Sequence, residues 1–407
     1  MSCRAFSTLG DMRQSPTGRV VGPRGACKSV LLSAHGSAHY INVMATNAAV
    51  PRLSDSTPAG AERRGEGRGA PDRRARPPAF AAIDLGTNNC RMLIGVPSGG
   101  GFHVLDSFSR VVRLGEGLYR TGMLSDAAMD RAIEALSICA DRQRRWQVSA
   151  TRAIATEACR QAENGHAFIA RARTETGLPI ETISPREEIC LAMESCASLI
   201  TQAERRALLF DIGGGSTEIA WVRVPAAHGG SDRVTPQLIG YHTIPVGVVT
   251  LSERCAGWCE TEAGFAGVVD EVKALLRPFE ETHRISQEIR MGGVRLVGTS
   301  GTVTTIAGIA LNLDRYRRGA IDGTVLPHDV VAAGLESIRA MGRARLTEHP
   351  CIGADRVDFV LPGCAIFAAI EEMWPAADLA VADRGLREGM LMRLIRNARS
   401  RPRRCQA

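Results

Sequence analysis

Short apolar runs that end in glycine-rich turns punctuate the chain. Residues 80–84 form the first such run, and residues 91–96 have the pattern of the strand that returns after the turn. Ser125 is followed by apolar positions at helical spacing, so it is predicted to cap a helix. Strand and helix signals alternate from there to about residue 205, which is typical of an α/β fold.

The second half of the chain opens with the same pattern. Residues 208–211 form an apolar run, a glycine-rich turn follows, and residues 219–222 form a returning strand. Asp84 and Asp211 close the two apolar runs and stand 127 positions apart. The repeated unit predicts two lobes of related construction that enclose a cleft.

The first 78 residues show no sustained apolar period and are rich in Gly, Pro, Ser, Ala and Arg. Because such a segment buries little apolar surface, residues 1–78 are predicted to be disordered. They contain no compact apolar stretch between a basic start and a small-residue cleavage site, which argues against a secretory signal. An organelle transit peptide and an over-long gene model that begins upstream of Met44 stay open, and the second is preferred.

Basic residues concentrate at the two ends of the chain. Residues 1–78 hold 12 Lys and Arg against 5 Asp and Glu, which accounts for the whole net charge of +7. Residues 79–392 hold 32 basic against 38 acidic residues, so the body of the chain is acidic. Residues 397–407 are assigned to a basic tail. This placement of charge argues against a nucleic-acid partner.

Hydropathy and cysteine usage exclude two further classes. No window approaches the roughly 18 consecutive apolar residues of a membrane span, so no membrane partner is expected. The 12 cysteines are scattered without a Cys-x-x-Cys pair, which favours reduced thiols over a disulfide framework. We therefore expect a cytoplasmic protein.

The turn at residues 84–89 reads Asp-Leu-Gly-Thr-Asn-Asn. Small and amide side chains at a strand reversal allow backbone N–H groups to converge on an anion. An ordinary hairpin uses the same residues to reach positive φ, and it remains the alternative interpretation.

The turn at residues 211–218 reads Asp-Ile-Gly-Gly-Gly-Ser-Thr-Glu. Three consecutive glycines cost conformational entropy unless the backbone must approach a ligand, and phosphate is the predicted ligand. Asp211 and Glu218 bracket the turn, and their hard oxygen atoms suit Mg²⁺. The alternative is a glycine-rich turn with two solvated acids.

A third turn, Val-Gly-Thr-Ser-Gly-Thr at residues 297–302, precedes the helix-like run at 303–313. A phosphate is predicted at the N-terminus of that helix. The spacing of this turn matches neither the dinucleotide-binding fingerprint nor the P-loop.

Together with residues 155–160, 183–188 and 384–389, these turns resemble the exopolyphosphatase and guanosine-pentaphosphate phosphatase family. The resemblance runs from about residue 80 to about residue 396. It implies two actin-like, ribonuclease-H-like α/β lobes of the actin, sugar kinase and heat-shock ATPase superfamily, enclosing a cleft.

The resemblance also implies a division of the chain. The first lobe is expected at residues 79–205 and the second at 206–378, with a C-terminal helix at about 379–396 that returns to the first lobe. One departure from the family concerns Ile189 and Cys190, which replace the usual Ala-Arg. By the resemblance, this change implies one cation fewer near the substrate, with a consequence for affinity or chain-length preference.

Carried over residue by residue, the family pattern makes Glu188 the base that activates water, with Glu187 secondary. Arg160 resembles the family's phosphate-contacting arginine. Asp211 and Glu218 remain the expected Mg²⁺ ligands. The residues expected to bind substrate phosphates are Asp84, Gly86, Thr87, Asn88, Gly213, Gly214, Gly215, Ser216, Thr217, Gly298, Thr299, Ser300 and Gly301.

The implied reaction is removal of the terminal phosphate of inorganic polyphosphate by in-line attack of water, with magnesium as the cofactor. Guanosine pentaphosphate is the alternative substrate. A non-enzymatic sensor or a kinase of the same fold is the alternative outside this reaction. A homodimer is expected.

Overall fold

The computed structural model describes residues 77–201, 203–225, 235–255 and 257–400, all of which lie in one compact unit. The segment predicted to be disordered therefore lies outside the described residues, except for Pro77 and Pro78, which are exposed and without regular structure.

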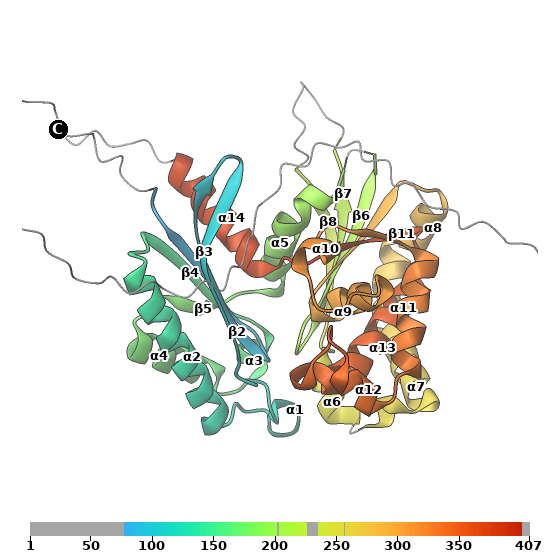
Figure 1. The fold of residues 1–407 in the computed structure, drawn as a ribbon, viewed down its shortest axis with the longest axis horizontal. Coiled ribbons are helices and arrows are strands. Elements are labelled where there is room, and N and C mark those ends of the chain that lie inside the picture. Colours follow the sequence, from blue (N-terminus) through green and yellow to red (C-terminus); the bar gives the residue numbers. More distant parts are fainter. Residues whose placement is uncertain (1–76, 202, 226–234, 256, 401–407) are drawn as a thin grey trace, which may run out of the picture. The chain divides into compact units, whose positions relative to one another are not determined.

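The first lobe is built on a mixed sheet with the strand order β3-β2-β1-β4-β5 (Figure 1). Its strands are β1 (Phe80–Leu85), β2 (Asn89–Ser98), β3 (Gly101–Val111), β4 (Ala150–Ala155) and β5 (Ile180–Thr182). Its helices are α1 (Leu118–Thr121), α2 (Asp126–Arg145), α3 (Glu157–Gln161), α4 (Gly165–Thr176), α5 (Pro185–Cys196) and the 3₁₀ turn η1 (Ala197–Leu199). Ser125 caps α2 as predicted, because its hydroxyl accepts the N–H of Ala128 at 3.3 Å.

The second lobe contains a six-stranded mixed sheet with the order β10-β11-β9-β6-β7-β8. Its strands are β6 (Arg206–Ile212), β7 (Thr217–Arg223), β8 (Gln237–Ile244), β9 (Val294–Thr299), β10 (Val325–Pro327) and β11 (Asp378–Ala382). Its helices are α6 (Val248–Cys255), η2 (Trp258–Glu260), α7 (Glu262–His283), α8 (Ile285–Arg290), α9 (Gly301–Ala310), α10 (Arg318–Ile321), α11 (His328–Ala340), α12 (Arg343–Glu348), η3 (Ala354–Arg356) and α13 (Val357–Met373). In both lobes the first two strands form the predicted antiparallel pair.

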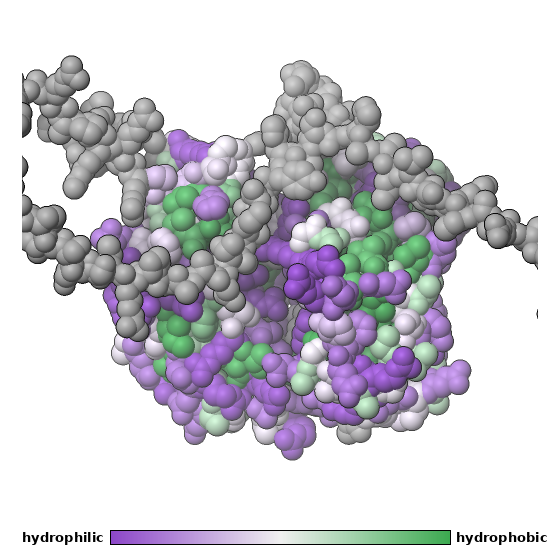
Figure 2. All heavy atoms as spheres, viewed as in Figure 1, coloured by the Kyte–Doolittle hydropathy of each residue, from purple (hydrophilic) through white to green (hydrophobic). Residues whose placement is uncertain are grey.

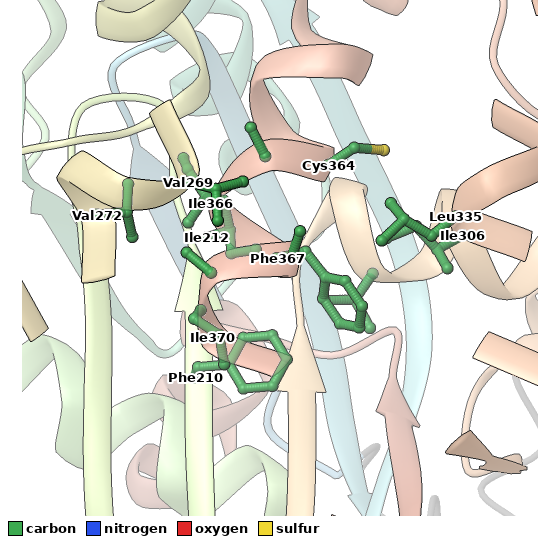
Figure 3. Packing of buried hydrophobic residues seen from close by; sticks show 14 of the residues in the cluster. Phe210, Ile212, Val269, Val272, Ile306, Leu335, Cys364, Ile366, Phe367 and Ile370 are labelled. Atoms are coloured by element: carbon green, nitrogen blue, oxygen red, sulfur yellow. The ribbon is translucent and has the colours of Figure 1, made fainter. Parts of the chain in front are cut away.

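The core of the second lobe lies between its sheet and the helices α7, α9, α11 and α13 (Figure 3). Phe210 on β6 packs against Phe367 on α13 with ring centroids 5.9 Å apart. Val269 on α7 and Ile370 on α13 belong to the same buried cluster. Removal of this apolar surface from water holds the helices against β6 and thereby sets the direction in which β6 delivers Asp211.

Two helices pack between the facing surfaces of the sheets. The helices are α5 and α14 (Leu386–Ser400), and both contribute to one apolar cluster with β1 of the first lobe and β6 of the second. Ala82 and Leu209 are the members of this cluster from the two central strands. Figure 1 shows α14 and α5 beside these strands. The helix that carries Glu188 is therefore fixed by apolar packing from both lobes.

The C-terminal part of the chain differs from the expectation of one helix at 379–396. Residues 378–382 form β11, which pairs parallel with β9 and completes the second sheet. Helix α14 begins only at Leu386 and ends at Ser400, so it includes the start of the predicted basic tail. Residues 379–382 are all buried, as is typical of a parallel strand that is covered on both faces, and the sequence interpretation did not foresee this strand.

The surface is mostly polar on the face seen in Figure 2, where hydrophobic residues occur in small groups among hydrophilic ones. No helix within the described ranges is long and apolar enough to cross a bilayer. The described cysteines are unpaired and, apart from Cys190, buried.

Candidate active site

The site begins where the central strands β1 and β6 end. Asp84 lies one residue before the end of β1, and Asp211 lies one residue before the end of β6. In the second sheet, Asp211 is aligned with Glu218 on β7 and with Thr299 on β9. Loops that follow adjacent parallel strands gather at one sheet edge, which is the usual place for a ligand in α/β folds.

The two aspartates influence each other's ionisation. Burial raises the pKa of Asp211 to about 6, and the negative charge of Asp84 adds to the increase. Burial likewise raises the pKa of Asp84, against the opposing effect of Arg91 and Arg387. The ends of β1 and β6 therefore bring their carboxylates into one electrostatic environment.

The first turn presents unused hydrogen-bonding groups. Its carbonyls are occupied, because Thr87 O accepts the N–H of Gly115 and Asn88 O accepts those of Val112 and Arg113. The N–H groups of Thr87 and Asn88 donate no hydrogen bond to any described residue, and the buried Asn88 Oδ1 has no partner among them. Since the side-chain amide can be placed either way round, this position offers a donor or an acceptor to a ligand.

The second turn shows the same arrangement. Gly213 donates to Ser216 O at 2.9 Å, and the carbonyls of Gly213 and Gly214 accept N–H groups from the start of α6. Within the described part of the chain, the N–H groups of Gly214 and Gly215 have no acceptor. Consecutive unpaired N–H groups in a tight turn form an anion-binding concavity.

The two turns approach each other closely, and this explains the glycines. A Cβ at Gly214 would lie 3.0 Å from Thr87 Cβ, and one at Gly215 would lie 2.7 Å from Thr87 Oγ1. Any larger residue would separate the turns. Glycine is therefore required here for close approach of the two lobes.

The third turn has a mixed role. Ser300 has φ of 107°, and its buried hydroxyl has no partner among the described residues. A non-glycine residue in this region of φ is strained, and such strain clusters at ligand sites. Gly301 begins α9, whose first N–H groups point out of the helix.

Three residues of the predicted phosphate set also make structural contacts. Gly298 lies inside β9, where a Cβ would be 2.6 Å from Phe210 Cζ, so it is needed for packing. The hydroxyl of Thr299 donates to Arg384 O, and that of Thr217 donates to Val246 O at 2.7 Å. These hydroxyls hold backbone segments, and their assignment as phosphate ligands stays a prediction. Strand position and packing produce these structural contacts, and neither can be read from the turn motif.

Glu188 and Arg160 form a close ion pair although they stand far apart in the sequence. Arg160 Nη1 lies 2.6 Å from Glu188 Oε2 and 3.0 Å from Ile183 O. Glu157 Oε2 accepts hydrogen bonds from Nε and Nη2 of the same guanidinium at 2.9 and 2.6 Å. Sequence analysis did not single out Glu157, although its i, i+3 spacing from Arg160 was an available signal.

Burial determines the ionisation of Glu188. It raises the pKa of Glu188 to about 7, in spite of Arg160, and Asp84 and Asp211 raise it further. A carboxyl group with this pKa exchanges protons near neutral pH. The raised pKa is compatible with the role of a base, which stays a prediction for Glu188.

Glu187 points to different partners. Its Oε1 accepts Arg152 Nη2 at 2.7 Å, and Arg393 Nη1 lies 3.8 Å away. Ser184 caps the same helix by accepting the N–H of Glu187 at 3.2 Å. These contacts anchor the start of α5. The next residue, Glu188, faces Asp84 and Asp211 instead.

Glu218 completes a group of buried acids. Burial raises its pKa well above the ordinary value, and the charges of Glu188 and Asp211 add to the increase. The Ser216 hydroxyl donates to its side chain. No three His, Cys, Asp or Glu side chains in the described ranges are arranged as a ready metal cage.

This arrangement fits magnesium. Mg²⁺ is held by one or two carboxylates together with waters and substrate phosphates, and it does not require a preformed protein cage. Mutual repulsion among Asp84, Asp211, Glu188 and Glu218 is the electrostatic condition that a divalent cation relieves. The residues present are therefore compatible with the ion expected from the sequence.

A roomy cavity lies elsewhere. A cavity of about 430 Å³ is lined by residues of α6, η2, α11, α12 and α13, including Cys255, Arg339 and Leu361. None of the residues predicted to act in catalysis or binding lines it. The candidate site is thus marked by unpaired amides and buried charges rather than by volume.

Comparison with known proteins identifies the family. The family model described as "Ppx/GppA phosphatase family" matches residues 94–398. A Haemophilus influenzae protein named "Putative exopolyphosphatase" is 27% identical over 333 residues, which cover 80% of this chain and 94% of that protein.

Solved structures extend the agreement to the fold. The crystal structure of an exopolyphosphatase-like protein is 26% identical, with a TM-score of 0.69 over 79% of this chain and 99% of its own. The Aquifex aeolicus member of the Ppx/GppA family is 25% identical, with a TM-score of 0.64 over 80% of this chain and 99% of its own. The predicted α/β fold of two actin-like lobes is confirmed. Because the family model spans well over half of the chain, the chain belongs to the Ppx/GppA phosphatase family.

Proposed function

We propose that the protein is an exopolyphosphatase, which hydrolyses the terminal phosphate of inorganic polyphosphate. The observation that carries the proposal is Glu188, a buried carboxyl with a pKa of about 7 that faces Asp84 and Asp211. It lies on the same site as the unpaired N–H groups of the first two turns. The name of the Haemophilus influenzae relative supports the choice of substrate.

In the proposed reaction, Glu188 accepts a proton from water as the water attacks the terminal phosphorus in line with the leaving oxygen. The N–H groups of Thr87, Gly214 and Gly215 hold phosphoryl oxygens and stabilise the charge that develops on them. Arg160 orients Glu188 and contributes positive charge next to the attacked phosphoryl group. Asp211 and Glu218 would hold magnesium, which would supply additional charge stabilisation when bound.

Direct attack by water is favoured over a covalent route through the nearby thiols. Burial raises the pKa of Cys159, next to Arg160, to about 12. Burial likewise raises the pKa of Cys196, on the helix of Glu188, to about 12. Both side chains stay protonated at neutral pH, and a thiol is a poor nucleophile in comparison with a thiolate.

The deciding experiment is a side-by-side assay of phosphate release from polyphosphate and from guanosine pentaphosphate, with magnesium. Polyphosphate should give the higher kcat/KM. A clear preference for guanosine pentaphosphate would replace the proposed substrate and keep the mechanism. Absence of phosphate release from both would overturn the proposal and favour a sensor of the same fold.

The proposed metal ligands are tested separately. Asp211→Asn and Glu218→Gln should each raise the magnesium concentration that gives half-maximal rate, because each removes a charge beside the proposed ion. Asp314→Asn, an exposed acid paired with Arg317, is the matched control. Unchanged magnesium dependence in both site variants would contradict the assignment.

A further inference from the structure

Two guanidinium groups at the site stand out because they are poorly compensated. The side chains of Arg91 on β2 and Arg387 on α14 donate no hydrogen bond to any described residue. The shortest ion contact of Arg387 is 3.9 Å, to Glu388 Oε1. Since buried arginines normally bind carboxylates or carbonyls, an unused guanidinium fork is available to an external anion.

The acid closest to Arg387 is already occupied. Glu388 Oε1 accepts Arg318 Nη2 at 3.0 Å, and Glu388 Oε2 accepts the N–H of Gly385 at 3.0 Å. Glu388 therefore caps its own helix and binds the second lobe. Each of its two oxygens already accepts a hydrogen bond, and neither accepts one from Arg387.

The backbone places Arg387 between two of the turns. Arg384 O accepts the hydroxyl of Thr299 at the third turn, and Arg387 follows three residues later in the first turn of α14. Helix α14 packs against β1, the strand that ends beside Asp84. The Arg387 side chain is 18% exposed, so it is largely enclosed yet still reaches solvent.

The charges around Arg387 agree with this placement. Arg387 is among the groups that lower the pKa of Asp84, and it also lowers the pKa of the buried Arg91. Two cations that repel each other beside the catalytic acids provide favourable positions for negative oxygens.

We propose that Arg387 is a substrate-binding residue whose guanidinium contacts phosphoryl oxygens of a bound phosphoric-anhydride chain. This inference rests on the proposed function, because it assigns a further contact to the same substrate. A planar guanidinium binds two phosphoryl oxygens at once, whereas lysine presents a single point charge. Arg387→Lys should therefore recover only part of the function of the wild-type side chain.

The test measures binding apart from turnover. Tripolyphosphate with magnesium is titrated by calorimetry into the Glu188→Gln protein, which should bind without hydrolysis. Addition of Arg387→Met should weaken this affinity at least about tenfold, and Arg387→Lys should have an intermediate effect. In the otherwise wild-type protein, Arg387→Met should lower kcat/KM at least about a hundredfold.

Arg396→Met is the matched control on the same helix. Arg396 is 63% exposed and pairs with Glu194 on α5, so its loss should leave tripolyphosphate affinity within about twofold. Thermal unfolding of each variant separates lost binding from lost folding. If Arg387→Met does not fold, Arg387→Lys, which retains the charge and the aliphatic stem, decides the outcome.

The outcomes distinguish the two proposals. Tripolyphosphate affinity that is equal in folded Arg387 variants and in the parent overturns the role of Arg387 alone. Failure of the Glu188→Gln protein to bind tripolyphosphate at all overturns the Arg387 contact and the proposed substrate together. Weaker binding in Arg387→Met but not in Arg396→Met supports the contact, whichever polyphosphorylated substrate is hydrolysed fastest.

Discussion

Individual side chains at this site have chemistry that depends on their surroundings. Glu188 and Glu187 are neighbours on α5, but the first is buried among acids and Arg160, whereas the second anchors the helix through Arg152. Burial raises the pKa of Glu188 to about 7. Two adjacent glutamates thus have different surroundings, because they point in different directions from the same helix.

Glu188→Gln should lower kcat for polyphosphate at least about a hundredfold and leave KM nearly unchanged, because it removes a general base and keeps the shape of the side chain. Steady-state kinetics with purified protein measure both constants. Glu187→Gln should cause the smaller loss, since Glu187 holds the helix rather than the water. Near-wild-type turnover by Glu188→Gln would rule out the assigned base.

The buried acids also predict a pH dependence of stability without metal. In the folded chain the pKa values of Asp211 and Glu188 are raised, chiefly by burial, to about 6 and about 7. The folded state therefore binds more protons than the unfolded state between the ordinary carboxyl pKa, about 4, and about 7. The free energy of unfolding should fall as pH rises through this window.

Urea unfolding in the presence of a chelator, at pH 5 and at pH 8, measures this change. Asp211→Asn should reduce the loss of stability between the two pH values, because it removes one of the titrating groups. Magnesium at pH 8 should restore part of the stability by binding only the folded state. A free energy of unfolding that rises from pH 5 to pH 8 in the chelated protein would contradict the prediction.

At the scale of elements, the second turn is held in place by the start of α6. The carbonyls of Gly213 and Gly214 accept N–H groups of Val248 and Val249 at 3.0 and 2.8 Å. Gly247 precedes this helix and lies against the turn, where a Cβ would be 2.4 Å from the Gly214 carbonyl carbon. The position of the amides proposed to bind phosphate thus depends on a residue outside the glycine motif.

Gly247→Ala should reduce kcat/KM at least about tenfold, because backbone atoms cannot yield to the new methyl group without displacement of the turn. Gly319→Ala is the matched control, since Gly319 is exposed and its Cβ would meet no atom within 4 Å. Kinetics at saturating magnesium compare the two variants. Equal activity of the two would show that the turn tolerates the displacement.

At the scale of the molecule, a hydrogen bond between the start of α1 and helix α6 links the two lobes. The N–H of Gly117, which precedes α1, donates to Glu253 Oε1 on α6 at 2.9 Å. Glu253 Oε2 is buried and has no partner among the described residues. A charged acceptor makes this a stronger bond than a neutral one, with a worth of about 1.5–3 kcal/mol.

Glu253→Ala should raise KM on the order of tenfold, since closure of the lobes around substrate loses this bond. Amide hydrogen exchange at Gly117 should become faster in the same variant, which a change in the substrate contacts alone would not produce. Glu253→Gln keeps an acceptor oxygen and should lie close to wild type in both measurements. Unchanged exchange at Gly117 in Glu253→Ala would show that this bond does not hold the lobes together.

The sequence by itself determined the local units of this protein. Apolar runs that end in glycine turns predicted the strand pairs β1–β2 and β6–β7, and the Ser125 cap predicted the start of α2. These signals are local, because alternation, capping and turn formation depend on residues within a few positions of one another. The fold class and the family followed from the same motifs.

Tertiary structure alone decided how these units combine. The approach of Thr87 to Gly214, the ion pair between Arg160 and Glu188, and the enclosure of Arg387 join residues that are distant in the sequence. Strand register likewise gave Gly298 a packing role that its motif did not reveal. Burial and charge at a site are sums over neighbours contributed by both lobes, so the pKa of Glu188 and the unpaired state of a guanidinium exist only once the chain has folded.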